Sequence, residues 1–251
     1  MPGVEDRVAL ITGGGRGIGR VIAKTLAARG ARVMCVARTR QQLEEVGLEY
    51  SVADLGTPEG CAQAIADTES RLGPIEILVC NHGIGSAHEQ LVWEQEPDAW
   101  DETMRVNLDG PFHLSRLALA GMVERRYGRL VYISSTAGLV AEPGSCAYNS
   151  SKHGLIGLMR SVALDAGGFG ITANAILPGW VRTSMSERSA EQEAKDSGIS
   201  TDQVWRQRAA LYPPGRVVTA QEVAELTAFL VSEEASGING EAVRVALGSL
   251  V

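Results

Sequence analysis

The chain has 251 residues, a formal net charge of -7 and an isoelectric point near 5.2. An acidic surface repels nucleic-acid phosphates and anionic lipid headgroups, so we expect neither a nucleic-acid partner nor a membrane partner. The apolar share of 45% suits a globular fold, and the sequence has no apolar stretch long enough to span a membrane.

Short runs rich in Val, Ile and Leu alternate with longer amphipathic stretches along the chain. Most of the short runs are continuously apolar, which is typical of strands that are covered on both faces in a parallel sheet. The predicted strands cover residues 7–12, 32–37, 48–53, 75–80, 129–134, 171–177 and 242–246. The predicted helices cover residues 17–29, 58–71, 98–124, 147–166 and 219–232. This alternation predicts a single α/β domain over residues 1–251, a Rossmann-like, doubly wound parallel sheet of seven strands flanked by helices.

Two connections depart from regular alternation. The connection at 38–47 is only about ten residues long, so its helix must be small or irregular. Residues 181–216 form a long polar insertion with helical patterns of its own. Ligands of doubly wound sheets bind at the carboxyl ends of the strands, so we expect this insertion to cover a substrate there.

A glycine-rich turn follows the first predicted strand and opens the first long helix. Its glycines at 13, 17 and 19 give the spacing G-x-x-x-G-x-G. Such a turn also serves close packing of a strand against a helix, but its place in the first β-α unit favours binding of a dinucleotide pyrophosphate. The predicted cofactor residues in the turn are Gly13, Gly15, Arg16, Gly17, Ile18 and Gly19.

The end of the second predicted strand decides between the two nicotinamide dinucleotides. An NAD site places an acid there to hold the ribose 2′-hydroxyl, whereas this chain has Arg38 and no acid at the strand end. Arg16 can approach the same group from the glycine turn. Either arginine alone would be read as a solvated charge, but together they predict NADP(H), because only NADP carries a 2′-phosphate.

Tyr148 and Lys152 lie four residues apart, so a helix there places both side chains on one face. A free phenol has a pKa near ~10, and we expect the Lys152 ammonium, with a cationic nicotinamide, to lower the pKa of Tyr148. This spacing is common on helix surfaces and needs corroboration.

Corroboration comes from motifs that occur in order along nearly the whole chain. They are the glycine turn, Asn81-His82-Gly83, Asn107, Ser134-Ser135, Tyr148 with Lys152, and Pro178-Gly179. In order and spacing they resemble the short-chain dehydrogenase/reductase family, in its single-domain branch of about this length.

The resemblance implies a catalytic set of four residues. Ser135, thirteen residues before Tyr148, would bind the substrate carbonyl. The adjacent Ser134 is not expected to have this role. Tyr148 would be the proton donor or acceptor, Lys152 would hold the nicotinamide ribose, and Asn107 would anchor a water that links Lys152 to solvent.

The resemblance also implies further cofactor contacts. Asp54 would contact the adenine, Asn81 would support the adjoining turn, and Thr183 would bind the nicotinamide amide. The remaining predicted cofactor residues are Leu55, Gly83, Pro178, Gly179 and Val181.

The predicted function is an NADP(H)-dependent oxidoreductase that interconverts a small ketone and a secondary alcohol by hydride transfer. Family members are usually tetramers or dimers built on their long helices, so we expect a homotetramer or homodimer. Substrate choice is expected in residues 84–100, 136–147 and 180–216.

Three alternatives stay open. The cover resembles that of 3-hydroxybutyrate dehydrogenases, which prefer NAD, and the tyrosine segment also resembles 3-oxoacyl-carrier-protein and polyketide ketoreductases. Such reductases need a basic docking patch, for which Arg125, Arg126 and Arg129 are candidates, although an acidic protein repels an acidic carrier. A non-catalytic NADP-binding protein is the third alternative, which has no need of the complete catalytic set.

Several features depart from the family or point elsewhere. His82 stands where the family commonly has a second asparagine or alanine, and we interpret it as a packed residue or a loop residue and not as a ligand. The other histidines, His88, His113 and His153, have no metal-site spacing, so we expect no metal. The four cysteines lack C-x-x-C spacing, and the N-terminus does not resemble a signal peptide, which together predict a cytoplasmic protein.

Overall fold

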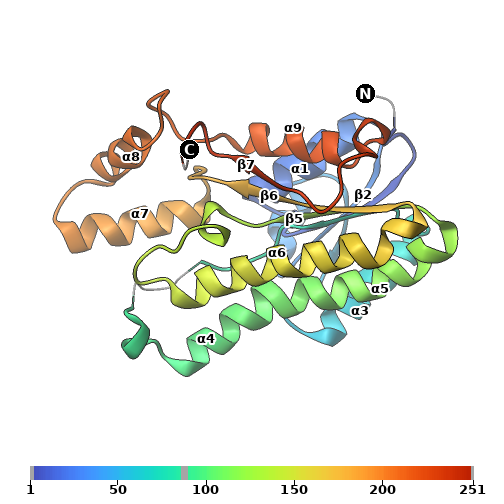
Figure 1. The fold of residues 1–251 in the computed structure, drawn as a ribbon, viewed down its shortest axis with the longest axis horizontal. Helices are drawn as coiled ribbons and strands as arrows, with labels where there is room; N and C mark the ends of the chain where they lie inside the picture. Colours follow the sequence, from blue (N-terminus) through green and yellow to red (C-terminus); the bar gives the residue numbers. More distant parts are fainter. Residues whose placement is uncertain (1–2, 86–89, 250–251) are drawn as a thin grey trace.

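The computed structural model describes residues 3–85 and 90–249 of the chain. They form a seven-stranded sheet with the order β3-β2-β1-β4-β5-β6-β7, in which every neighbouring pair is parallel (Figure 1). The strands are β1 (Val8–Thr12), β2 (Arg32–Ala37), β3 (Glu49–Val52), β4 (Ile77–Cys80), β5 (Gly128–Ile133), β6 (Ile171–Pro178) and β7 (Ala242–Val245). The predicted Rossmann-like, doubly wound sheet is confirmed, with strand ends that differ by one or two residues.

The helices follow the predicted pattern with one interruption. They are α1 (Gly17–Ala28), α2 (Arg40–Glu44), α3 (Pro58–Leu72), α4 (Pro97–Met104), α5 (Gly110–Arg125), α6 (Cys146–Ala166), α7 (Ser184–Ser197), α8 (Thr201–Ala210) and α9 (Ala220–Leu230). The helix predicted over 98–124 is interrupted by a π-helical turn, η2 (Arg105–Asp109). The insertion at 181–216 forms two helices, α7 and α8. Within the described residues, none of the helices combines the length and apolarity that crossing a bilayer requires.

Helices cover both faces of the sheet, which explains why the strands are continuously apolar. Helices α1 and α9 pack on one face, whereas α3, α5 and α6 cover the other (Figure 1). Alternate residues of one strand enter opposite cores: Leu10 packs with the α3, α5 and α6 side, and Ile11 packs with the α1 and α9 side. The sheet is thus a buried middle layer, and its carboxyl edge is left for ligands.

The sheet order reverses between β1 and β4, and loops on either side of that point diverge. In doubly wound sheets this divergence opens a crevice at the carboxyl edge. Thr12, the last residue of β1, holds the two strands together there. Its hydroxyl accepts hydrogen bonds from the backbone N–H of Asn81 (2.8 Å) and of His82 (3.1 Å).

Helices α7 and α8 project beyond this edge of the sheet and have a small core of their own (Figure 1, orange). The buried Arg208 guanidinium lies 3.7 Å from the centroid of the Trp180 ring and also faces Trp205. It forms an ion pair with Glu193 at 2.7 Å. Cation–π contacts and a paired, desolvated charge make these two helices a defined unit.

Candidate active site

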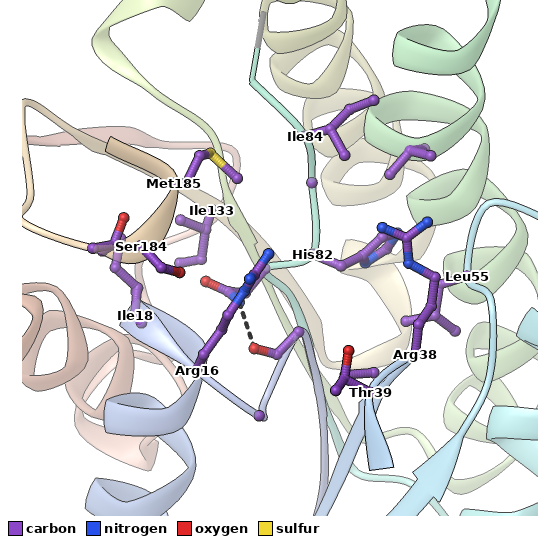
Figure 2. A pocket seen from close by; sticks show the side chains of 18 of the residues that line it. Arg16, Ile18, Arg38, Thr39, Leu55, His82, Ile84, Ile133, Ser184 and Met185 are labelled. Carbon is purple, nitrogen blue, oxygen red and sulfur yellow. Dashed lines mark hydrogen bonds between the residues drawn. The ribbon is translucent and has the colours of Figure 1, made fainter. Parts of the chain in front are cut away.

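A cleft at the carboxyl edge of the sheet runs from the glycine turn to the first turn of α7 (Figure 2). Predicted cofactor residues that line it are Gly13, Gly15, Arg16, Gly17, Ile18, Arg38, Asp54, Leu55, Asn81, Gly83, Tyr148, Lys152 and Thr183. Lining residues that the sequence did not point to include Thr39, Gln42, Val106 and Ile133. Ile84, Ser184 and Met185 also line the cleft, and they belong to the segments that were predicted to select the substrate. In Figure 2, Arg38, Thr39 and Leu55 lie at one side of the cleft and Ser184 and Met185 at the other.

Four predicted cofactor residues do not line the cleft, and packing explains each position. A Cβ on Gly19 would lie 2.3 Å from the Gly13 carbonyl oxygen, so this glycine lets α1 pack against the turn. The Gly179 N–H donates to the Val245 carbonyl at 3.0 Å, and Val181 pairs with Val218. Pro178 ends β6. Pro178, Gly179 and Val181 thus anchor the start of the 181–216 insertion to the sheet edge.

The glycine turn has the backbone that a phosphate cradle requires. Gly13 has φ +65° and Gly17 has φ +53°, a region that residues with a Cβ rarely adopt. The Asn81 side-chain amide donates to the Thr12 carbonyl at 2.9 Å and braces the turn from β4. The expectation that Asn81 supports this turn therefore agrees with its contacts.

Arg16 and Arg38 both reach the cleft from exposed positions, one on the glycine turn and one after β2 (Figure 2). Partial burial and the guanidiniums of Arg188 and Arg38 lower the pKa of Arg16. Within residues 3–85 and 90–249, no ion pair engages any of these three arginines, whereas the neighbouring Arg40 pairs with Glu44 at 4.0 Å. Arg16 and Arg38 therefore give the cleft two cations without acid partners, which fits a phosphate group.

The π-helical turn η2 carries Asn107 and aims its side chain at the loop after β4. The Asn107 Oδ1 atom accepts from the Ile84 N–H at 2.8 Å, and its amide donates to the Ile84 carbonyl at 2.9 Å. The same amide donates to Ser151 of α6 at 3.1 Å. Asn107 therefore joins three segments of the site, and π-turns of this kind are frequent at functional positions. The water role implied by the resemblance stays a prediction.

Tyr148 and Lys152 lie on one face of α6, as their spacing predicts. The Lys152 Nζ atom is 5.6 Å from the centroid of the Tyr148 ring and donates to the Ile133 carbonyl at 3.1 Å. A Cβ on Gly83 would lie 3.1 Å from Asn107 Oδ1 and 3.6 Å from Lys152 Nζ, so this glycine keeps the space between them open.

The two neighbouring serines take different positions. Ser135 faces the Tyr148 phenol and hydrogen bonds with it, and its hydroxyl also accepts from the Ala137 N–H at 3.1 Å. Ser134 is buried and donates to the Lys152 carbonyl at 3.1 Å, which anchors α6. Ser134 lines the cleft and Ser135 is not among the lining residues, but Ser135 is the serine whose hydroxyl contacts the Tyr148 phenol.

Burial is the largest influence on the pKa of Tyr148 in this structure, and the expected lowering by Lys152 together with a cationic nicotinamide stays a prediction. Burial raises the pKa of Tyr148, the hydrogen bond with Ser135 opposes that rise, and the Glu142 carboxylate adds to it. Burial also lowers the pKa of Lys152 to about 8. Desolvation of both groups is the larger effect here, and it keeps the phenol protonated.

His82 packs in the loop after β4, in agreement with its interpretation from the sequence, but the sequence did not reveal which residues it contacts. Its Nδ1 atom shares a 2.8 Å hydrogen bond with the Thr12 hydroxyl, and its ring packs beside Gly110, where a Cβ would lie 2.7 Å from Nε2. Burial, followed by the Lys152 ammonium, lowers the pKa of His82 to about 3. His82 is therefore neutral at physiological pH and braces the site. Of the other histidines, His88 lies outside the described residues.

This burial predicts a specific loss of stability in acid. An unfolded histidine binds a proton below a pH of ~6.5, but folded His82 does not until pH nears 3, so stability is lost as pH falls through that window. Between pH 7 and pH 5 the wild type should lose about 2 kcal/mol more free energy of unfolding than His82→Asn. Urea denaturation at both pH values checks this, and equal losses in the two proteins would contradict it.

Comparison with known proteins agrees with this geometry. A family model described as Enoyl-(Acyl carrier protein) reductase matches residues 13–249. The chain is 36% identical over 247 residues to D-beta-hydroxybutyrate dehydrogenase of Cupriavidus necator, covering 94% of this chain and 95% of that protein. It is 34% identical over 250 residues to 3-oxoacyl-[acyl-carrier-protein] reductase FabG of Escherichia coli, covering 96% of each.

Solved structures extend the comparison from sequence to fold. Levodione reductase superposes with a TM-score of 0.92 at 30% identity, covering 96% of each chain. An actinorhodin polyketide ketoreductase with NADPH superposes with a TM-score of 0.89 at 32% identity, covering 96% of each chain. The chain therefore belongs to the short-chain dehydrogenase/reductase family, oxidoreductases that act on keto and hydroxy groups.

Proposed function

We propose that this protein is an NADP(H)-dependent oxidoreductase that interconverts a ketone and a secondary alcohol, with Tyr148 as general acid and base. One observation carries the proposal. A single cleft is lined by Arg16 and Arg38, which have no acid partner among the described residues, and by a half-buried phenol, Tyr148, that hydrogen bonds with Ser135 and lies one helical turn from Lys152. That combination serves a phosphorylated dinucleotide and proton transfer to one oxygen atom.

Each residue of the catalytic set has a role that its contacts support. The bound nicotinamide would supply or accept the hydride. Ser135 and Tyr148 orient the carbonyl oxygen, and Tyr148 donates the proton to it. Lys152 holds the ribose and favours the phenolate once the proton has left. Asn107 positions Ile84 and α6 so that these groups stay together.

The choice of NADP(H) rests on Arg16 and Arg38. A 2′-phosphate is doubly charged and suits two guanidiniums without acid partners, whereas a 2′-hydroxyl would leave both cations unsatisfied. Asp54, which forms an ion pair with Arg105 at 3.8 Å, would contact the adenine, and Thr183 the nicotinamide amide. The related ketoreductase that was solved with NADPH supports the same choice.

Reduction of carrier-bound 3-oxoacyl groups is the second candidate, because relatives of that name cover 96% of the chain. The basic patch that was predicted to dock such a carrier is poorly suited to it. Arg129 is buried and pairs with Glu233 at 3.2 Å, Arg125 donates to the Ile75 carbonyl, and Arg126 donates to the Gly168 carbonyl. We therefore favour a free small ketone or alcohol over an acidic carrier protein.

A panel of ketones and acyl thioesters, each assayed with NADPH and NADH at equal concentration, tests the proposal. We expect turnover of at least one small ketone, with NADPH preferred. Faster reduction of acyl-carrier thioesters would favour the second candidate, and a wide preference for NADH would favour a 3-hydroxy acid dehydrogenase. Binding of NADPH without any turnover would indicate a non-catalytic NADP-binding protein.

We further propose a domain organisation, an oligomeric state and a cellular location for this enzyme. Residues 1–251 would act as one domain, with 181–216 covering the substrate. The exposed apolar side chains Phe112 on α5 and Leu164 on α6 support assembly into a homodimer or homotetramer. Cysteines 35, 61, 80 and 146 are free thiols, which supports a location in the cytoplasm, where thiols stay reduced.

A further inference from the structure

The first turn of α7 packs against the glycine turn. A Cβ on Gly17 would lie 3.4 Å from the Cγ2 atom of Thr183, the N-cap residue of α7. Ser184 and Met185, the first two residues of the helix, line the cleft together with Ile18. The cover therefore reaches the part of the cleft where a pyrophosphate would meet the start of α1.

Contacts with α8 show which face of α7 is turned away from the small core of the cover. Ser186, Ala190 and Ala194 are buried and recur at every fourth position, and the two alanines pack in the core shared with α8. Each helical residue rotates by about 100° around the axis, which places Arg188 about 160° from Ala190. Arg188 is exposed, and in this projection it falls between the two cleft-lining residues of the first turn, one turn further along α7.

Arg188 brings a third cation to the glycine turn. After burial, its guanidinium is the first charge that lowers the pKa of Arg16, ahead of Arg38. Among residues 3–85 and 90–249, none forms an ion pair or hydrogen bond with the Arg188 guanidinium, whereas Arg182 of the same cover pairs with Glu187 at 2.7 Å. Guanidiniums that repel each other without an acid between them favour a bound anion.

The side of the cleft that carries α7 identifies this anion. Figure 2 shows Ser184 and Ile18 on one side of the cleft, and Arg38 on the other. The 2′-phosphate is expected at Arg38, beside the end of β2. The pyrophosphate is expected at the N-terminus of α1, which begins at Gly17, and that is the side on which α7 packs. NADPH and NADH both carry this pyrophosphate.

We propose that Arg188 is a further cofactor-binding residue, which binds the dinucleotide pyrophosphate from the cover, opposite the backbone N–H groups of the glycine turn. This inference rests on the proposed function, because it requires a nicotinamide dinucleotide in the cleft. Helix α7 is then part of the cofactor site as well as a cover for the substrate. Arg38 selects NADPH over NADH, whereas Arg188 contributes equally to the affinity for both.

Equilibrium binding by the full chain, without a ketone, tests this inference. NADPH, NADH and ADP-ribose are titrated by calorimetry into the wild type, Arg188→Ala and Arg188→Lys, at low ionic strength. ADP-ribose has the pyrophosphate but neither the 2′-phosphate nor the nicotinamide. We expect Arg188→Ala to raise the Kd for all three ligands by about tenfold, the low end of the range for a hydrogen bond to a charged group. The ratio of the NADPH and NADH constants should stay unchanged, and Arg188→Lys should recover part of the affinity.

Lys195→Ala provides the matched control. Lys195 is exposed on the same side of α7, two turns further along and about 10 Å from Arg188 along the helix axis. Its removal makes the same change in net charge but should alter each Kd by less than about twofold, because salt screens charges at that distance. Alanine favours a helix at both positions, so α7 should persist, as circular dichroism would verify.

Each other outcome contradicts the inference in a different way. An unchanged Kd in Arg188→Ala, or an equal rise in Lys195→Ala, would overturn it while leaving the proposed function intact. A rise for NADPH alone would place Arg188 at the 2′-phosphate, and a rise for both dinucleotides but not for ADP-ribose would place it at the nicotinamide. A wild type that binds neither NADPH nor NADH would overturn the proposed function and this inference with it.

Discussion

Replacing Tyr148 with phenylalanine should lower kcat by about 10²- to 10⁴-fold, the range that a lost general acid produces. The substitution deletes one hydroxyl and keeps the ring, so packing at the start of α6 is preserved. The phenol is the group that hydrogen bonds with Ser135, and burial holds it protonated, which suits a donor to a carbonyl oxygen. Single-turnover oxidation of NADPH by the best ketone measures the effect.

Measuring NADPH binding by Tyr148→Phe distinguishes the loss of the proton donor from a folding defect. Because Arg16 and Arg38 are untouched in Tyr148→Phe, NADPH should still bind, as a fluorescence titration of the variant would detect. Turnover close to that of the wild type would rule out Tyr148 as the acid. Loss of both binding and turnover would indicate a folding defect, which circular dichroism would reveal, and Ser135→Ala would then serve as the second variant.

Removing the two unpaired arginines should change cofactor choice. A hydrogen bond to a charged group contributes about 1.5–3 kcal/mol, and every ~1.4 kcal/mol is tenfold in affinity. Arg38→Ala should therefore raise the Kd for NADPH about 10- to 100-fold, and the double variant with Arg16→Ala should raise it further. The Kd for NADH should change little, because NADH has no 2′-phosphate.

Arg40→Ala provides the matched control for this series. Arg40 stands two residues from Arg38, but it pairs with Glu44 and hydrogen bonds to Tyr50, so its loss should leave the preference intact. Titration of each variant with 2′,5′-ADP and with 5′-AMP isolates the phosphate contribution. Equal binding of the two nucleotides by the wild type would contradict the role of both arginines.

Features that follow from regular patterns of apolar residues and from helical spacing could be predicted from the sequence. Apolar runs identified all seven strands, and most of these runs are continuous because burial on both faces leaves no polar alternation. The short connection at 38–47 indicated a small helix, which is α2 (Arg40–Glu44). The spacing of Tyr148 and Lys152 gave their common face because α6 has regular helical geometry there.

Features that depend on tertiary contacts could not be predicted. The π-turn at Arg105–Asp109 adds a residue to one turn without breaking the apolar pattern, so 98–124 reads as one helix. Gly19 and Gly179 have the same residue type as the glycines that line the cleft, and only their neighbours show that they serve packing. The environment of His82 depends on Thr12 and Lys152, which are far away in sequence.

The pKa of Tyr148 shows why the spacing of two residues does not by itself predict their protonation states. Proximity of an ammonium at i+4 favours the phenolate, but both side chains leave water when α6 packs on the sheet. Desolvation then penalises each charged form, raising the pKa of the phenol and lowering that of Lys152. Sequence gives the partners in such a pair, and their burial decides which protonation state is favoured.

The central claim is that the Tyr148 phenol and the Ser135 hydroxyl share one substrate oxygen beside the nicotinamide. A crystal structure of the wild type with NADP⁺ and an unreacted ketone tests it most directly. We predict that Tyr148 Oη and Ser135 Oγ both lie within ~2.6–3.2 Å of the carbonyl oxygen, with the 2′-phosphate against Arg16 and Arg38. A carbonyl oxygen bound elsewhere, with Tyr148 out of hydrogen-bond reach of it, would contradict the account.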